Sequence, residues 1–305
     1  MVDPHGRLIT SVRVSITQKC NLHCLYCHQE GEDNQNHESL EMTPEEIQRI
    51  IEVLESFGVR RVKLTGGEPL IRRDIQEIVE GIDSVNGISE VSITTNGTRL
   101  KEFAKPLKDG GLARVNVSLD TLNPEIYKKI TGVDTIEKAV SGIRKAVEVG
   151  LKPVKVNMVL LKGVNDGEVG SMIQFAQSNG VVLQLIELES PREDEFYRRY
   201  HSDMMKIEEQ LKNKAEKVSV RQMHHRRKYY LPDRVEVEVV RPMHNTEFCQ
   251  YCNRIRITSD GQFKPCLFRS DNHVDFLSPL RRCTSTEDLK NLFLEAVKRR
   301  RPYFT

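Results

Sequence analysis

Short runs in which apolar and polar residues alternate recur along the first two thirds of the chain, and each is typical of a strand because successive side chains point to opposite faces. These runs occupy residues 12–17, 61–65, 90–95, 114–119, 153–160 and 182–188. Stretches with helical spacing separate them, near residues 43–58, 72–84, 100–109, 134–149 and 167–179. The repeated order of strand and helix predicts a parallel sheet with right-handed crossovers.

The helix expected after the first strand has the clearest signals. Thr43 can cap it, Pro44 suits the first turn, and Glu46 completes a capping box. An apolar stripe of Ile47, Ile50, Ile51, Leu54 and Phe57 then runs to Gly58.

Five of the predicted strands share a division into an apolar and a polar face. In the first strand, Val12 and Val14 alternate with Arg13 and Ser15. A sheet covered by helices on both sides has nearly continuous apolar strands, and a closed eight-stranded barrel fills its interior with branched apolar side chains. The pattern therefore predicts an α/β fold, an incomplete (β/α)6 barrel whose polar faces line a ligand-filled lumen. Its active site should lie at the C-terminal strand ends, where TGGEP, TTNG and SLD fall.

The pattern changes near residue 190. Residues 190–217 are highly charged and predict a loop and an exposed helix, 234–242 alternate as a partly exposed strand, and 254–268 predict a hairpin that turns at Asp260-Gly261. We therefore expect a barrel core over 1–190, a charged connecting segment over 191–233 and a small β-containing region over 234–305.

Composition limits the classes of function. The 305 residues include 46 Lys and Arg against 44 Asp and Glu, a net charge of +2, which does not favour nonspecific binding of nucleic acid. The N-terminal residues carry no signal-peptide pattern and no run approaches 18 apolar residues, so we expect a cytoplasmic protein without a membrane partner. Seven clustered cysteines suit metal ligation in a reducing compartment better than disulfides.

Three of these cysteines, Cys20, Cys24 and Cys27, lie in the loop after the first strand. A structural zinc ion takes four protein ligands, and only His23 and His28 lie nearby, both poorly placed for a tetrahedral site. Three thiolates suit a [4Fe–4S] cluster with one open iron, at which a small molecule can coordinate. Zinc remains the alternative.

This CxxxCxxC spacing, with Tyr26 before the last cysteine and TGGEP at 65–69, resembles the radical S-adenosylmethionine (SAM) superfamily. The resemblance implies that the open iron chelates SAM and that an electron from the cluster cleaves it to methionine and a 5′-deoxyadenosyl radical. It also implies that Tyr26, Gly67 and Ser118 contact SAM. The alternatives are a plain strand-to-helix turn at the glycine and an ordinary sheet hydroxyl at Ser118.

The second set of cysteines is Cys249, Cys252 and Cys266, again three. A zinc ribbon that uses Cys283 or His273 as its fourth ligand is the main alternative to a second cluster. A ribbon usually supplies its last ligands as a second close pair, and Cys283 stands alone. We expect Cys283 itself to be a buried or surface thiol.

Together with TTNG, VSLD, KVN and CxxCNRxRxTxDG, these motifs resemble the GTP 3′,8-cyclase family over residues 13–268. The resemblance implies two [4Fe–4S] clusters, one cleaving SAM and one facing the purine of the substrate. It also implies removal of the 3′ hydrogen of GTP and closure of the C3′–C8 bond, the first step of molybdenum cofactor biosynthesis.

Cations on the predicted lumen faces support an anionic substrate independently. Arg13, Lys63 and Lys155 lie on three strands, and Arg254 and Arg256 share one face of a fourth. Five converging cations are costly to desolvate unless a polyanion such as a triphosphate neutralises them. The resemblance implies that GTP contacts six residues: Arg13, Lys63, Thr94, Lys155, Arg254 and Arg256. Of these, Arg13, Arg254 and Arg256 are also the expected catalytic residues.

The chain departs from the family's usual pattern at three places. Glu189 stands where a SAM-contacting Met is common, Lys63 replaces a more usual Arg, and the sequence ends in RRRPYFT rather than in a Gly-Gly tail. By resemblance we expect a flavodoxin- or ferredoxin-like electron donor and a downstream pyranopterin-forming enzyme as partners. A homodimer stays open.

Two rival hypotheses remain. One is a radical SAM enzyme that modifies peptides or proteins, although such enzymes usually carry denser C-terminal cysteines. The other is a non-enzymatic iron–sulfur or zinc module that binds RNA through RQMHHRRKYY, residues 221–230.

Overall fold

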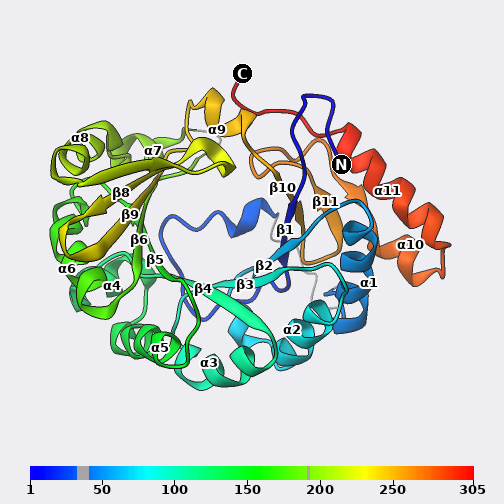
Figure 1. Cartoon of the computed structure of the whole chain (residues 1–305), viewed down its shortest axis with the longest axis horizontal. Coiled ribbons are helices and arrows are strands. Elements are labelled where there is room, and N and C mark those ends of the chain that lie inside the picture. The colour runs from blue at the N-terminus through cyan, green and yellow to red at the C-terminus, as the bar shows by residue number, and fades with distance from the viewer. Residues whose placement is uncertain (33–40, 191–192) are drawn as a thin grey trace.

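The six alternating segments form six parallel strands in chain order, as predicted, in a computed structural model that describes residues 1–32, 41–190 and 193–305. The strands are β1 (Ser11–Ser15), β2 (Arg61–Thr65), β3 (Glu90–Thr95), β4 (Leu112–Ser118), β5 (Val154–Leu160) and β6 (Val182–Glu187). Five helices lie in the predicted stretches and cover the outside of the curved row of strands (Figure 1). They are α1 (Pro44–Glu55), α2 (Ile75–Asp83), α3 (Leu100–Asp109), α5 (Ile136–Glu148) and α6 (Val169–Asn179).

Local signals account for the start of α1. The Thr43 hydroxyl accepts a hydrogen bond from Glu46 N at 3.2 Å, and the Glu46 carboxylate accepts one from Thr43 N at 2.9 Å. This reciprocal pair is the predicted capping box. A further helix that the sequence analysis missed, α4 (Pro124–Thr131), follows β4, with Asn123 as its cap. Short 3₁₀ turns are η1 (Gln29–Gly31), η3 (Pro69–Ile71), η4 (Asp166–Glu168), η5 (Met223–His225) and η6 (Pro232–Arg234).

The C-terminal third adds strands to both ends of the row. β9 (Val235–Val240) pairs in parallel with β6, and β10 (Arg254–Ile257) pairs in parallel with β1. Antiparallel strands extend each side: β8 (Arg227–Leu231) and β7 (Lys217–Val220) beyond β9, β11 (Gln262–Lys264) and β12 (Val274–Asp275) beyond β10. Over the described residues, β12 and β7 stand at opposite ends of the order, so the barrel is open as predicted.

One prediction about this region is wrong in its detail. The segment 234–242 was expected to be a partly exposed strand, but β9 is largely buried because it lies between β6 and β8. The predicted hairpin is present, with β10 and β11 joined at Gly261, whose φ of +75° suits glycine. The remaining helices are α7 (Glu195–Tyr200), α8 (Met204–Lys214), α9 (Thr246–Gln250), α10 (Leu277–Arg281) and α11 (Thr286–Lys298).

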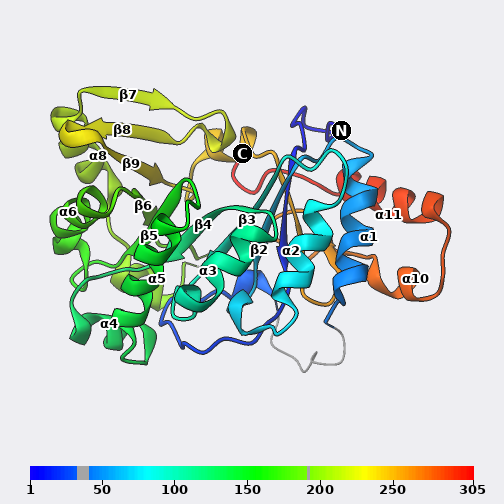
Figure 2. The same ribbon diagram turned by 60° about the horizontal axis from the view of Figure 1, so that its bottom comes forward.

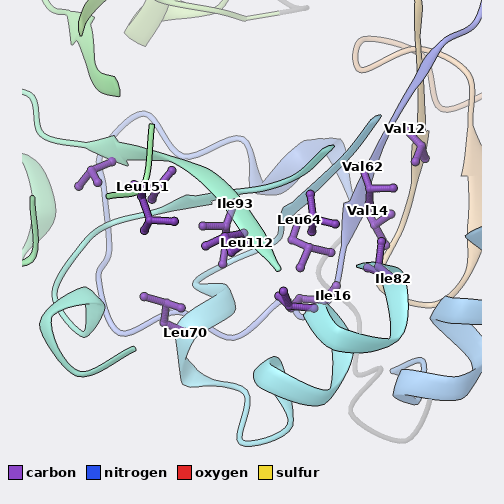
Figure 3. Packing of buried hydrophobic residues seen from close by; sticks show 14 of the residues in the cluster. Val12, Val14, Ile16, Val62, Leu64, Leu70, Ile82, Ile93, Leu112 and Leu151 are labelled. Atoms are coloured by element: carbon purple, nitrogen blue, oxygen red, sulfur yellow. The ribbon is translucent and has the colours of Figure 1, made fainter. Parts of the chain in front are cut away.

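The apolar faces of the strands form the main core together with the helices. Val12 and Val14 of β1 lie beside Val62 and Leu64 of β2, with Ile82 of α2 packed against them (Figure 3). Each is at most 1% exposed. Burying one such side chain contributes roughly 1.5–3 kcal/mol relative to leaving it in water. The apolar faces of the strands therefore point outward against the helices, and the polar faces of the strands point into the interior.

The loop after β1 passes across one end of the strands, where Figure 2 shows it in blue along the lower side of the row. Among the described residues, no helix combines the length and the apolar character that crossing a membrane requires.

Candidate active site

The polar strand faces line one large cavity, as predicted. It encloses about 1740 Å³, open solvent at its mouth included. The predicted lumen positions that line it are Arg13, Lys63, Thr94, Asn116, Ser118, Lys155, Asn157, Arg254 and Arg256.

The strand register aligns three of the predicted cations in one row. Arg13 on β1 lies opposite Arg256 on β10 and opposite Lys63 on β2. Neighbouring strands lie about 4.8 Å apart, so these charges repel one another strongly. Burial, followed by the nearby charges of Arg114 and Arg13, holds the pKa of the Lys63 ammonium well below its usual range.

A carboxylate that the sequence analysis missed partly relieves this repulsion. Glu30, in the turn after the first cysteines, accepts hydrogen bonds from Arg256 at 2.6 Å, Arg13 at 3.1 Å and Thr65 at 2.9 Å. Burial alone favours the protonated acid, but the guanidinium groups of Arg13 and Arg256 outweigh it and hold the pKa of the Glu30 carboxyl well below its usual range. No local pattern marks Glu30, because its partners come from three distant segments.

Lys155 belongs to a second buried cluster on the opposite side of the row. Its ammonium donates to Glu238 at 2.5 Å, and Gln184 donates to the same carboxylate at 2.7 Å. Arg221 and Arg226 face the other oxygen of Glu238 at 3.3 and 3.1 Å. Three cations thus surround one carboxylate, which leaves an excess of positive charge. Burial lowers the pKa of Lys155 to about 8, against the opposing attraction of Glu238.

The cavity as a whole is cationic. Ten arginine or lysine side chains line it, against four carboxylates. The cations are Arg7, Arg13, Lys63, Arg114, Lys155, Arg221, Arg226, Arg254, Arg256 and Arg301; the carboxylates are Glu30, Asp120, Glu187 and Glu189. This imbalance favours a strongly anionic ligand.

The first three cysteines lie on one loop at the edge of this cavity. Cys20 and Cys27 are exposed and Cys24 is half-buried. The Cys20 sulfur accepts a hydrogen bond from Leu22 N at 3.4 Å, a contact typical of cluster thiolates. Tyr26 and His28 of the same loop line the cavity.

The TGGEP motif fixes this loop by close packing. A Cβ atom at Gly66 would lie 2.3 Å from Thr17 O, and one at Gly67 would lie 2.2 Å from Lys19 O, so only glycine fits at either position. The buried Glu68 carboxylate accepts hydrogen bonds from Thr95 and Asn96 N, both at 2.6 Å. The motif thus ties the cysteine loop to the TTNG segment. Contact between Gly67 and SAM stays a prediction.

Tyr26 and Ser118, the other predicted SAM contacts, both line the cavity. The Tyr26 hydroxyl donates to Asp120 at 2.5 Å, and the second oxygen of Asp120 accepts a hydrogen bond from Val159 N at 2.8 Å. Burial raises the pKa of the Asp120 carboxyl to about 6. Asp120 therefore orients the tyrosine beside the cysteine loop, a role that the SLD motif alone did not reveal.

The second three cysteines all line the cavity, although α9 and two separate loops carry them. Burial opposes ionisation of Cys252, but the charges of Arg300, Arg254 and Arg7 lower the pKa of its thiol overall. A cationic surrounding that stabilises thiolate suits a metal cluster. Cys283 is exposed, and His273 lies 3.2 Å from the Lys264 ammonium.

A single-metal site is not apparent at either set. In residues 1–32, 41–190 and 193–305, no three His, Cys, Asp or Glu side chains gather closely enough to hold one ion.

Part of the basic segment 221–230 faces the cavity rather than an outer surface. Arg221, Met223, His224 and Arg226 all line the cavity, and the two arginines are paired with Glu238. This placement does not favour the RNA hypothesis, which relied on these residues at the surface. Tyr229 and Tyr230 continue this segment into β8. This tyrosine pair is the sequence signal that could have predicted the position of the segment in the sheet.

The places where the chain departs from the family pattern also lie at the cavity. Glu189 lines it, with an oxygen 4.0 Å from His28 Nε2. Arg301 and Tyr303 from the final residues line it as well, and the Tyr303 ring lies 5.1 Å from Phe268, centroid to centroid.

Comparison with known proteins agrees with this architecture. Residues 14–176 match the Radical SAM superfamily, and residues 181–305 match Molybdenum Cofactor Synthesis C. Similar solved structures include Streptococcus suis SuiB bound to precursor peptide SuiA (TM-score 0.66, 17% identity, 86% of this chain and 60% of that one). Another is native anSMEcpe with bound AdoMet (TM-score 0.59, 20% identity, 86% and 75%). At these identities they show the fold alone.

Curated relatives are far more similar. The probable GTP 3′,8-cyclase of Thermococcus kodakarensis is 49% identical over 100% of this chain and 99% of its own length. That of Methanosarcina acetivorans is 51% identical over 100% of this chain and 90% of its own length. This chain therefore belongs to the GTP 3′,8-cyclase family of the radical SAM superfamily.

Proposed function

We propose that this chain converts GTP to 3′,8-cyclo-7,8-dihydro-GTP, the first step of molybdenum cofactor biosynthesis. The observation that carries the proposal is that one cavity contains both an excess of cations and the second set of cysteines, and that Tyr26 and Ser118 line the same cavity. The enzyme is a lyase that uses SAM and two [4Fe–4S] clusters.

The chain's own groups bind and orient the two reactants. Arg13, Lys63 and Arg256 in their register row, with Lys155 and Arg254 nearby, offer the countercharge that a triphosphate needs. Tyr26, held by Asp120, and Ser118 line the part of the cavity assigned to SAM. Thr94 adds a neutral hydroxyl between them.

Two sets of thiols would hold the clusters: Cys20, Cys24 and Cys27 for the first, Cys249, Cys252 and Cys266 for the second. When bound, the first cluster would supply an electron for cleavage of SAM, and the second would offer a coordination site for the substrate.

The partners of the reaction form part of the proposal. The electron comes from a flavodoxin- or ferredoxin-like donor. The product passes to a pyranopterin-forming enzyme. A homodimer is compatible with a cavity built entirely within one chain.

The experiment that tests the proposal is anaerobic reconstitution with iron and sulfide, followed by incubation with SAM, GTP and a reductant. We expect about eight irons per chain, because each three-cysteine site suits a four-iron cube, and mass spectrometry should detect a cyclised nucleotide with the mass of GTP. Cleavage of SAM with no change in GTP would favour the rival peptide-modifying function.

A further inference from the structure

His224 occupies an unusual position in the cavity wall. Its side chain lines the cavity beside Cys249 and Cys252, the residue is only 6% exposed, and its Nδ1 atom has no hydrogen-bond partner. A buried polar group without a partner is costly, commonly by about 1–3 kcal/mol. Such a group at a binding site is satisfied when the ligand supplies the missing partner.

The structure fixes the orientation of this ring. His224 stacks on Phe248 with the ring centroids 3.9 Å apart and the planes 20° apart. Its backbone N donates to Tyr251 O at 2.9 Å, and its φ of +61° is uncommon for a residue other than glycine. A strained backbone and a stacked ring at a cavity wall indicate that a specific side-chain position is being maintained.

The surroundings of the ring suit a flat heterocycle. The stacked Phe248 and the adjacent Met223 both line the cavity with His224. An imidazole nitrogen can donate or accept one hydrogen bond, which suits the polar edge of a purine.

We propose that His224 hydrogen-bonds the purine of the bound nucleotide and positions it against the second set of cysteines. This inference rests on the proposed function, and it deepens that function by naming a residue that selects the base. In this arrangement the strand cations hold the triphosphate, whereas His224 contacts the base of the same substrate.

The neighbouring residue supplies a matched control. His225 also has a positive φ, +46°, and also stacks on an aromatic ring, that of Tyr251, at 3.4 Å. Its Nδ1 lies 2.8 Å from Glu247, and among the described residues His225 is not part of the cavity wall. Replacing each histidine with Phe preserves stacking and carries the same backbone cost, so the two variants differ in their access to substrate.

The test measures anaerobic equilibrium binding of GTP and of inorganic tripolyphosphate to the reconstituted holoenzyme. His224→Phe should weaken GTP binding about tenfold, the usual order for one lost hydrogen bond in a buried site, and leave tripolyphosphate binding and iron content unchanged. His225→Phe should change neither affinity. His224→Asn or His224→Gln, which place an amide where one ring nitrogen lies, should restore most of the affinity for GTP.

Three results would overturn the inference. If His224→Phe binds GTP as tightly as the parent, the ring serves stacking only, although the proposed function stands. If it loses GTP and tripolyphosphate equally, His224 serves the phosphate end. If the parent holoenzyme binds tripolyphosphate but gains no affinity from guanosine, the proposed function fails and the inference fails with it.

Discussion

Arg13 of β1 and Arg256 of β10 lie directly opposite each other in parallel register, and both donate to the carboxylate of Glu30. Two like charges from opposite ends of the sequence are thus held side by side by one carboxylate from the cysteine loop. Such an arrangement is stable only while a countercharge is present. A bound triphosphate would provide a second countercharge. Substrate binding should therefore be linked to the position of the cysteine loop.

Replacement of Glu30 tests this link. Glu30→Gln keeps the shape but removes the negative charge, so we expect the free energy of unfolding of the ligand-free protein to fall by about 1–3 kcal/mol. Saturating GTP should reduce this loss, because the triphosphate then neutralises both arginines. Thermal unfolding with and without GTP measures the difference. Glu52→Gln, in an exposed pair with Arg49, is the control and should show no GTP-dependent loss. An equal loss with and without GTP would contradict the link.

Removal of one arginine should affect substrate binding and spare the clusters. Arg256→Ala should weaken GTP binding by roughly 1.5–3 kcal/mol, or about ten- to a hundredfold in Kd, with full iron content. Guanosine should bind the parent poorly and respond little to the change. Arg281→Ala, which removes an outer pair with Glu46, controls for loss of a surface charge. Guanosine binding as tight as that of GTP would rule out a phosphate site here.

The affinity for GTP should depend on pH through Lys155. Its pKa of about 8 means that the free protein carries this charge below pH 8 and loses it above. Since bound phosphate favours the charged form, binding takes up a proton above pH 8, and the affinity should fall as pH rises, by at most about tenfold per pH unit. Titrations from pH 7 to 9.5 measure this. In Lys155→Arg the decline should become shallower, because a guanidinium stays charged, whereas Lys63, whose pKa is also lowered, can still take up a proton on binding. A decline that is equally steep in that variant would assign the effect to a group other than Lys155.

Substitution of one cysteine should have a different effect in each of the two sets. Cys24→Ala should abolish formation of 5′-deoxyadenosine, whereas Cys252→Ala should lose about four irons and the cyclised product while some SAM is still cleaved. Iron analysis and chromatography of the nucleosides measure both. SAM cleavage that survives Cys24→Ala would mean that this loop does not hold the cleaving cluster.

The division of each strand into two faces was enough to predict the inner wall. Arg13, Lys63 and Lys155 line the cavity because strand alternation is a local property that depends on nothing distant. The helix α1 was predictable for the same reason, since its cap and its apolar stripe lie within 16 residues of sequence.

What the sequence did not reveal depends on contacts between distant segments. Glu30 meets Arg256 across 226 positions, and Glu238 meets Lys155 across 83. His224 belongs to a segment that resembles a solvated run of charge until β8 pairs with β9 and turns it inward. Neither hydrophobic period nor composition encodes such pairings.

The central claim is that this chain removes the 3′ hydrogen of GTP, and the most direct measurement uses GTP deuterated at C3′. With the reconstituted enzyme, SAM and a reductant, we predict one deuterium in the 5′-deoxyadenosine that forms and none in that position when unlabelled GTP is used. Unlabelled 5′-deoxyadenosine from deuterated GTP, alongside a cyclised product, would contradict the claim, because the hydrogen would then have come from another position.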